Sequence, residues 1–238
     1  MKNYFIKEGY KHKDSARTAV DSGSQYWSKY RLSSSKYYQH HVYKLAQELI
    51  IENKLNSCVD VGCGSGYKLV NLISPFCKDT TGIDQPFIIE RCKKVYGENN
   101  INWLSEDFEN AKIGTNKKFD LIICSDVIEH LLDPDILLNY LKSISHKDSI
   151  IIISTPERDI LHGSANNSAT NVEHIREWNQ TELTAYIESS GFNIKGIHLL
   201  RPLKFHLNRL YFSHLKRFYK RFNYCMAIVC QPSRITKN

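Results

Sequence analysis

Val59-Asp60-Val61-Gly62-Cys63-Gly64-Ser65-Gly66 is the stretch that decides the fold. It begins as an apolar run of strand-forming residues, ends in three glycines separated by single residues, and leads into a helix-like pattern at residues 68–76. Glycines at such a turn let the backbone bend sharply and approach a ligand closely. The stretch therefore predicts a strand–turn–helix unit whose turn binds a ligand.

Around this unit, strand-like and helix-like segments alternate along the chain. Strands are predicted at residues 57–61, 80–83, 101–104, 119–124, 149–154, 192–200 and 224–229, and helices at 35–53, 68–76, 86–96 and 134–145. A further helix begins at Asn179, which forms a capping-box pattern with Glu182, and ends before Gly191. This alternation predicts an α/β fold with a mostly parallel sheet and helices on both faces.

Length and composition indicate a globular protein. With 238 residues, 42% of them hydrophobic and 24% charged, the chain can bury a core without disulfides. Its longest purely aliphatic run, residues 150–153, is far shorter than the roughly 18 residues of a membrane span, and residues 1–10 lack the apolar core of a secretion signal. Because seven cysteines occur without a CxxC pair, we expect reduced thiols, no bound metal and a cytoplasmic location.

We expect an N-terminal arm at residues 1–34 and a single domain at residues 35–238. Two segments interrupt the alternation: residues 155–179, predicted to be a lid loop, and residues 202–222, a basic and aromatic insert between the last two strands. From Ser189 to Asn238 there are ten Lys and Arg residues and no Asp or Glu. This segment favours an anionic partner, with a merely soluble basic face as the alternative.

The glycine spacing is Gly-x-Gly-x-Gly, unlike the GxGxxG of dinucleotide sites, and Asp60 lies two residues before the first glycine. A carboxylate there is unfavourable beside a pyrophosphate, whereas the sulfonium and ammonium groups of S-adenosylmethionine favour it. The next strand ends at Asp84, which is suited to accept hydrogen bonds from both ribose hydroxyls. The strand after that leads to Asp107 and Phe108, suited to an adenine amino group and ring face. Together these positions predict an S-adenosylmethionine site.

Over residues 25–230 the chain resembles the class I S-adenosylmethionine-dependent methyltransferases. The glycine motif, Asp84, Asp107-Phe108 and the run at residues 119–131 (FDLIICSDVIEHL) match the successive motifs of that family in order. The resemblance implies a Rossmann-like sheet of seven strands, mostly parallel, with the last strand antiparallel. It also implies a transferase that uses S-adenosylmethionine and releases S-adenosylhomocysteine.

The resemblance also implies positions for the parts of the cofactor. The methionine end would lie at the glycine turn, the ribose after the second strand, the adenine after the third, and a far wall after the fourth. The residues concerned are, in that order, Asp60, Gly62, Gly64 and Gly66; Asp84 and Gln85; Asp107 and Phe108; Ser125 and His130. The N-terminal arm would pack over the cofactor through Trp27, with Arg31 on the methionine carboxylate, and ordinary packing of an aromatic arm is the alternative.

Two further stretches resemble a subgroup linked to surface-polysaccharide and other glycan modification: residues 154–159 (STPERD) and 171–178 (NVEHIREW). This resemblance implies O-methylation of a small acceptor that contains a sugar or a phosphate. A hydroxyl acceptor needs a base, for which His130 and His174 are the leading candidates. Asp126 and Glu129 are further candidates, with a helix cap as their alternative role. A phosphate needs cationic groups, for which the candidates are Arg158, Arg176 and His162. Salt bridges within the loop and purely structural histidines are the alternatives.

Other functions stay open at this point. The interleaved basic and aromatic residues at 201–221 suit an RNA methyltransferase, although no RNA-binding module or Asn-Pro-Pro-Tyr motif is present. A non-catalytic cofactor-binding subunit could dock on a partner protein through the same segment. The insert at residues 202–222 could also attach the protein to a membrane surface.

Overall fold

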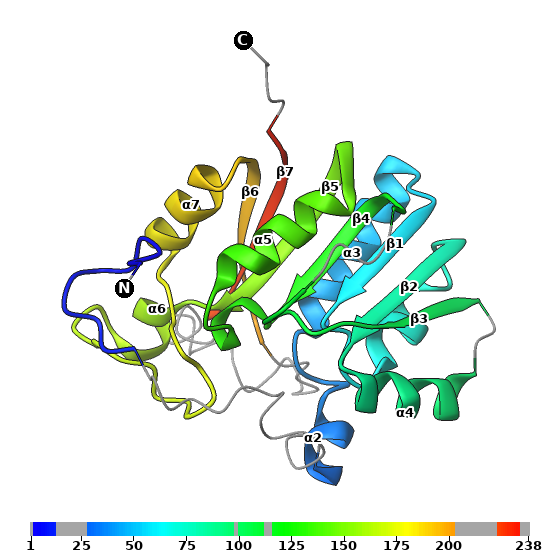
Figure 1. The fold of residues 1–238 in the computed structure, drawn as a ribbon, viewed down its shortest axis with the longest axis horizontal. Coiled ribbons are helices and arrows are strands. Elements are labelled where there is room, and N and C mark those ends of the chain that lie inside the picture. Colours follow the sequence, from blue (N-terminus) through cyan, green and yellow to red (C-terminus); the bar gives the residue numbers. More distant parts are fainter. Residues whose placement is uncertain (1, 13–27, 98–99, 112–115, 203–222, 234–238) are drawn as a thin grey trace, which may run out of the picture.

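The computed structural model describes residues 2–12, 28–97, 100–111, 116–202 and 223–233. Its centre is one seven-stranded sheet with the strand order β3-β2-β1-β4-β5-β7-β6 (Figure 1). The strands are β1 (Ser57–Val61), β2 (Asp79–Asp84), β3 (Ile101–Ser105), β4 (Phe119–Ser125), β5 (Ser145–Pro156), β6 (Phe192–Leu200) and β7 (Cys225–Pro232). All seven predicted strands are present.

Strand direction follows the expected pattern. β1 pairs in parallel with β2 and β4, and the parallel pairing continues outward to β3 on one side and β5 on the other. β7, the last strand of the chain, lies between β5 and β6 and is antiparallel to both. The predicted Rossmann-like sheet with an antiparallel last strand is confirmed.

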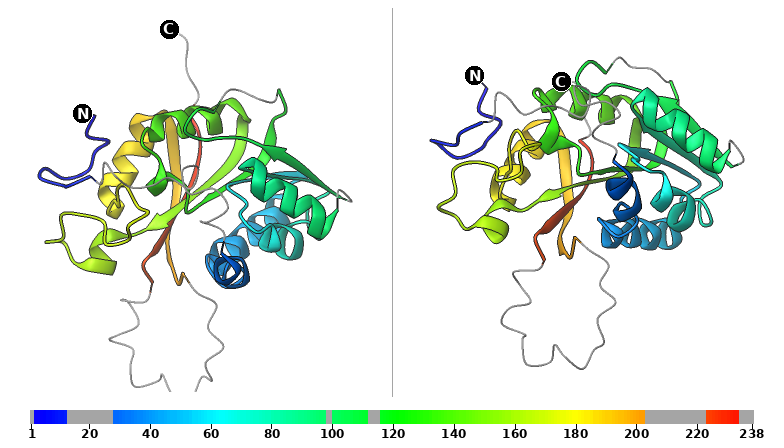
Figure 2. Two further views of the ribbon diagram at one scale, coloured as in Figure 1. Left: turned by 60° about the horizontal axis from the view of Figure 1, so that its bottom comes forward. Right: turned by 90° about the horizontal axis from the view of Figure 1, so that it is seen from below.

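Helices cover both faces of the sheet (Figures 1 and 2). One face packs against α3 (His40–Asn53), η2 (Leu69–Ile73) and α4 (Pro86–Tyr96), and the other against η3 (Ile128–His130), α5 (Pro134–Ser143) and α7 (Gln180–Ser189). The short helices α2 (Lys29–Ser34) and α6 (Arg158–His162) belong to neither layer. Apolar strand residues such as Val59 and Ile122 are fully buried between the layers, as expected for a sheet covered on both sides.

Element boundaries follow local chemistry. Asn179 accepts a hydrogen bond from the backbone of Glu182 and the Glu182 side chain accepts one in return, so the predicted capping box at the start of α7 is present. Gly191, with a φ of 85°, follows the end of that helix. β5 begins four residues earlier than predicted because Ser145 pairs with Phe119 ahead of an irregularity in the β4–β5 ladder.

The two ends of the segment at residues 155–178 are buried in the fold, whereas its middle, residues 163–172, is mostly exposed. They contain α6, and Arg158, Glu177 and Trp178 are each at most 1% exposed. The N-terminal residues 2–12 pack against them: Tyr4 accepts a hydrogen bond from Trp178 Nε1 at 2.9 Å, and Tyr10 accepts one from the backbone of Glu177 at 2.9 Å. These two hydrogen bonds therefore connect the segment to the N-terminal residues.

Two sequence predictions lie outside the described residues: Trp27, and residues 203–222, which make up nearly all of the basic insert. Among the helices that are described, none has the length and apolar character that crossing a bilayer requires.

Candidate functional site

A cavity of about 620 Å³ lies at the carboxyl ends of the parallel strands. The loops that follow β1, β2, β3 and β4 line it, together with α2, the start of α3 and residues 170–177. In open α/β sheets, ligands bind in the crevice at this edge, where the strand order reverses. In this sheet the strand order reverses between the neighbouring parallel strands β1 and β4.

The glycine turn after β1 forms one side of the cavity. Gly62 and Gly64 line it with φ values of 82° and 55°, a conformation that other residues rarely adopt. A Cβ on Gly62 would overlap the side chain of Val127 in the loop after β4. A larger residue at position 62 is therefore disfavoured by this contact as well as by its backbone conformation.

Gly66 does not line the cavity, contrary to its expected place beside the cofactor. A Cβ there would lie 2.9 Å from Cη2 of Trp103 and 3.1 Å from Sγ of Cys92. The third glycine therefore makes room for packing between the turn, α4 and β3. Spacing alone does not distinguish a glycine that faces a ligand from one that faces a neighbouring element.

Asp84, at the end of β2, connects the glycine turn to the next loop. One carboxylate oxygen accepts a hydrogen bond from the Gly64 backbone at 2.8 Å, and the other accepts one from the Gln85 backbone at 2.7 Å. The side chain is buried yet lines the cavity, and Gln85 lines it too. Burial raises the pKa of Asp84 to about 6, although the two hydrogen bonds act in the opposite direction and lower the pKa. The carboxylate is thus held in one orientation toward the cavity.

Asp60 lies beneath the cavity wall and is not itself part of the lining. It is fully buried, and Oδ2 accepts a hydrogen bond from the hydroxyl of Tyr43 at 2.7 Å. Oδ1 has no hydrogen-bond partner among the described residues. Burial raises the pKa of Asp60 to about 7, although Lys68 nearby lowers it. A cationic group in the cavity would offset the cost of this buried charge.

Asp107 and Phe108 line the cavity after β3. Asp107 accepts hydrogen bonds from the Glu109 backbone and the Asn110 side chain, each at 3.0 Å, which fixes its carboxylate. Phe108 is 7% exposed and packs edge-on against Tyr140, with ring centroids 5.6 Å apart. Both residues lie on the same side of the cavity as Asp84, as the predicted adenine position requires.

The loop after β4 forms the opposite wall. Ser125 shares a hydrogen bond with Ser154 at 2.7 Å, and Asp126, with a φ of 55°, receives one from the side chain of Gln39. The other oxygen of Asp126 has no hydrogen-bond partner among the described residues, and burial raises its pKa to about 6. The sequence predicts Asp126 to be a helix cap or a candidate base, and its positive φ is visible only in the structure.

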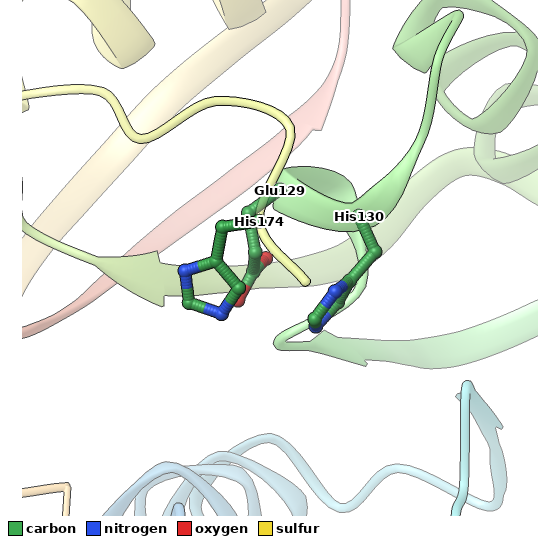
Figure 3. A group of neighbouring side chains, drawn as sticks. All are labelled: Glu129, His130 and His174. Carbon is green, nitrogen blue, oxygen red and sulfur yellow. The ribbon is translucent and has the colours of Figure 1, made fainter. Parts of the chain in front are cut away.

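His130 and His174 face each other across this wall, and both line the cavity. Their rings are edge-to-face with centroids 4.9 Å apart, and Glu129 lies beside them (Figure 3). His130 Nδ1 is 2.8 Å from the backbone oxygen of Glu173, and His174 Nδ1 is 2.6 Å from Oε1 of Glu177. Burial lowers the pKa of His130 to about 3, so its ring is neutral at physiological pH.

Arg31 lines the cavity but turns toward the protein. Its Nη2 lies 2.6 Å from both carboxylate oxygens of Glu173. The pair joins α2 to the loop that carries His174. The charge of Arg31 is therefore largely matched by Glu173, and its contact with the methionine carboxylate stays a prediction.

The predicted anion-binding residues do not line the cavity. Arg158 is 1% exposed and binds Glu182, while Arg176 donates to the backbone oxygens of Leu131 and Leu132 at 2.8 and 3.0 Å. His162 lies 3.2 Å from the carboxylate of Glu177. The salt-bridge alternative thus describes Arg158, which also pairs with Asp159 at 2.9 Å, and His162, whereas Arg176 is held by backbone oxygens of the loop after η3.

The cavity lining carries more negative than positive charge. Arg31 and Lys68 are the cationic side chains of its described part, and the acidic residues there are Asp84, Asp107, Glu109, Asp126, Glu173 and Glu177. Lys68 donates to the backbone oxygen of Ser35 at 3.1 Å. Such a lining suits a cationic or neutral ligand better than a phosphate.

Comparison with known proteins shows which family the chain belongs to. Residues 29–195 match a family model described as a methyltransferase domain. A ubiquinone biosynthesis O-methyltransferase of Coxiella burnetii is 26% identical over 179 residues, covering 67% of this chain and 73% of that protein. A tRNA U34 carboxymethyltransferase of Nautilia profundicola is 30% identical over 111 residues, covering 44% of this chain and 35% of that protein.

Among solved structures, the N-methyltransferase NodS of Bradyrhizobium japonicum, in complex with S-adenosyl-L-homocysteine, has a TM-score of 0.57 at 16% identity. The match covers 82% of this chain and 86% of NodS. At that identity the likeness concerns the fold. The chain spans about half the length or less of the first curated relatives it matches.

Proposed function

Because this chain belongs to the S-adenosylmethionine-dependent methyltransferase-domain family, we propose that it transfers the methyl group of that cofactor to a hydroxyl of a small polar acceptor. The observation that carries the proposal is the facing arrangement of two walls in one cavity. The glycine turn and Asp84 form one wall, and His130 with His174 forms the other.

The described residues fit the cofactor. Gly62 and Gly64 line the cavity with positive φ values and without side chains, so the backbone of the turn can approach a ligand closely. The oxygen of buried Asp60 that has no hydrogen-bond partner among the described residues suits a nearby cationic group. S-adenosylmethionine carries a sulfonium and an ammonium and has no phosphate. Its charge therefore matches a lining in which carboxylates predominate.

We assign the cofactor-holding roles by position. Asp84 would accept hydrogen bonds from the ribose hydroxyls, and Asp107 with Phe108 would contact the adenine, since both follow the next strand of the sheet. Gly62, Gly64 and Arg31 would lie at the methionine end. The bound cofactor supplies an activated methyl group, so the protein chiefly aligns the acceptor and excludes water.

The acceptor would contact His130 and His174. A hydroxyl loses its proton during methyl transfer, and the two imidazoles offer ring nitrogens in the described lining that can assist this loss. Glu177 orients His174 through a hydrogen bond of 2.6 Å. Transfer to a hydroxyl also agrees with the name of the O-methyltransferase relative.

A sugar-containing acceptor fits this cavity better than a phosphorylated one. The cationic side chains in the described lining already contact Glu173 and Ser35, and Arg158 and Arg176 bind inside the protein. Carboxylates and hydroxyls such as those of Asp126 and Ser125 instead suit the hydroxyl groups of a sugar. We therefore place the activity in glycan or related small-molecule biosynthesis.

The experiment is a turnover assay with labelled S-adenosylmethionine against a panel of free sugars, nucleotide sugars, catechols and tRNA. We expect methylation of a hydroxylated small molecule, with turnover lost in Asp84→Asn and retained in Asp79→Asn at the other end of β2. Methylation of tRNA alone would reject the small-acceptor proposal and favour an RNA methyltransferase. Tight binding of S-adenosylhomocysteine without turnover on any acceptor would favour the non-catalytic subunit.

A further inference from the structure

Glu129 is a buried carboxylate without the partners that such a group normally has. Its side chain is fully buried, and neither oxygen meets hydrogen-bond geometry with a described residue, although the Thr155 hydroxyl lies close by. A buried, unpaired carboxylate is costly, and in native proteins it commonly marks a place where an ion or ligand binds. Asp126, three residues earlier in the chain, also has a buried oxygen that meets hydrogen-bond geometry with no described residue, although the Ser154 side chain lies close by.

Two imidazoles lie beside this carboxylate. Ligating atoms of Glu129, His130 and His174 are all within 4.8 Å of one another, and Figure 3 shows the three side chains gathered at η3 and the neighbouring loop. A backbone hydrogen bond holds the loop in place: the amide of Ile175 donates to the backbone oxygen of Glu129 at 2.9 Å. The spatial cluster is thus fixed by main-chain contacts as well as by its side chains.

The hydrogen bonds at the ring edges determine which nitrogen of each histidine can bind a cation. His130 Nδ1 lies 2.8 Å from the Glu173 backbone oxygen, and His174 Nδ1 lies 2.6 Å from the Glu177 carboxylate. When Nδ1 donates to an oxygen, Nε2 carries the lone pair, and metal-binding histidines are usually oriented in this way. The side-chain nitrogen of the exposed Asn171 lies 2.9 Å from His174 Nε2. When a cation binds this ring nitrogen, the Asn171 side chain would rotate away or turn its oxygen toward the cation.

We propose that Glu129, His130 and His174 form a binding site for a transition-metal dication, with Zn²⁺ as the preferred ion. Two histidines and one glutamate are a donor set of catalytic zinc sites, which keep a further position open, whereas Mg²⁺ prefers oxygen ligands alone. Both histidines line the cavity, so the open position would face the acceptor.

This inference rests on the proposed function, since the ligand of the open position would be the acceptor hydroxyl. A bound dication favours the ionised form of an oxygen ligand, so it would take over the assistance that a base otherwise provides. The cysteine pattern predicts no metal site, but these donors are two adjacent residues and a third located 44 positions further on, a spacing without a motif.

The test measures metal binding without cofactor or acceptor. Metal-free protein is titrated with ZnCl₂ by calorimetry, and with CoCl₂ while the visible absorption is followed. We expect one ion per chain and absorption bands of protein-bound Co²⁺. Glu129→Gln and His174→Gln should each weaken binding by about tenfold or more. His146→Gln, which changes the ring that pairs with Asp120 at the opposite edge of the sheet, should not alter it.

Circular dichroism and binding of S-adenosylhomocysteine establish that each variant is folded. Absence of stoichiometric binding, or equal affinity in the wild type, Glu129→Gln and His174→Gln, would overturn the site. Binding of one ion that both variants weaken, with no acceptor methylated, would support the site while the proposed function fails. Full turnover in the presence of a chelator, without stoichiometric metal binding, would support the function and reject the site.

Discussion

Arg158 holds Glu182 through two hydrogen bonds, from Nη1 to Oε2 at 2.7 Å and from Nη2 to Oε1 at 2.9 Å. Glu182 also closes the capping box that starts α7, so this pair connects α6 to α7 in the interior of the protein. Arg158, which the sequence predicts to bind the acceptor, is therefore a structural residue.

Arg158→Ala should destabilise the protein. Removing one member of a buried ion pair leaves the other charge uncompensated, and this typically costs about 3–5 kcal/mol. Urea denaturation followed by circular dichroism gives the free energy of unfolding, and the KM for the acceptor should change little at temperatures where the variant is folded. A large rise in KM with unchanged stability would instead restore the acceptor-binding role.

Gly62→Ala should cost more stability than Gly97→Ala. Both glycines have positive φ values, 82° and 70°, so alanine is strained at either position, by about 1–3 kcal/mol. An added Cβ at Gly62 would overlap Val127, whereas nothing lies within 4 Å of one at Gly97. We expect an additional loss of about 1–3 kcal/mol at Gly62, measured by thermal unfolding. Equal losses at both positions would show that the turn and Val127 move apart easily.

Asp84→Asn should weaken binding of S-adenosylhomocysteine. The proposed hydrogen bonds from two ribose hydroxyls to a charged acceptor would be lost, which costs about 1–3 kcal/mol. Isothermal titration calorimetry at pH 8, where the wild-type carboxylate with its pKa of about 6 is ionised, measures the effect. The matched variant Asp79→Asn, at the opposite end of β2, should bind as the wild type does. Unchanged affinity in Asp84→Asn rejects the ribose assignment.

Asp60 should make the cofactor-free protein less stable as the pH rises from about 4 to 7. Burial raises the pKa of this carboxyl from 3.8 to about 7, so in that range the folded protein keeps a proton that the unfolded chain has released. Its contribution to stability is therefore full below pH 4 and declines toward pH 7, by at most about 1.4 kcal/mol per pH unit. Asp60→Asn should lack this contribution. The free energy of unfolding of both proteins is measured at several pH values between 4 and 7, and an equal decline in the two proteins would contradict the prediction.

Much of the fold follows from short-range patterns. The capping box at Asn179, the proline at the start of α4 and the alternation of apolar runs with helical periods all depend on residues within a few positions of one another. The same holds for the glycine turn and for Asp84 at the end of the next strand. Parallel strands bring such positions to one edge of the sheet, so their grouping could be predicted before the structure.

Other features depend on partners that are distant in the chain. The loop at residues 155–178 has weak periodicity, and its burial depends on Tyr4 and Tyr10, which lie more than 160 positions away from Trp178 and Glu177. Gly66 faces Trp103, a contact that no glycine spacing encodes. Boundaries such as the early start of β5 likewise reflect pairing with a neighbouring strand.

The sequence by itself determined the α/β class, the order of the motifs and the glycine turn at the cavity, because strand and helix periods and turn glycines are properties of the local backbone. Only the tertiary structure decided that Arg158 and Arg176 bind inside the protein, and that Glu129, His130 and His174 share one space. The physical reason is that a charged side chain takes its role from the groups that surround it after folding. Its charge is written in the sequence, but its burial and its partners are set by contacts between segments far apart in the chain.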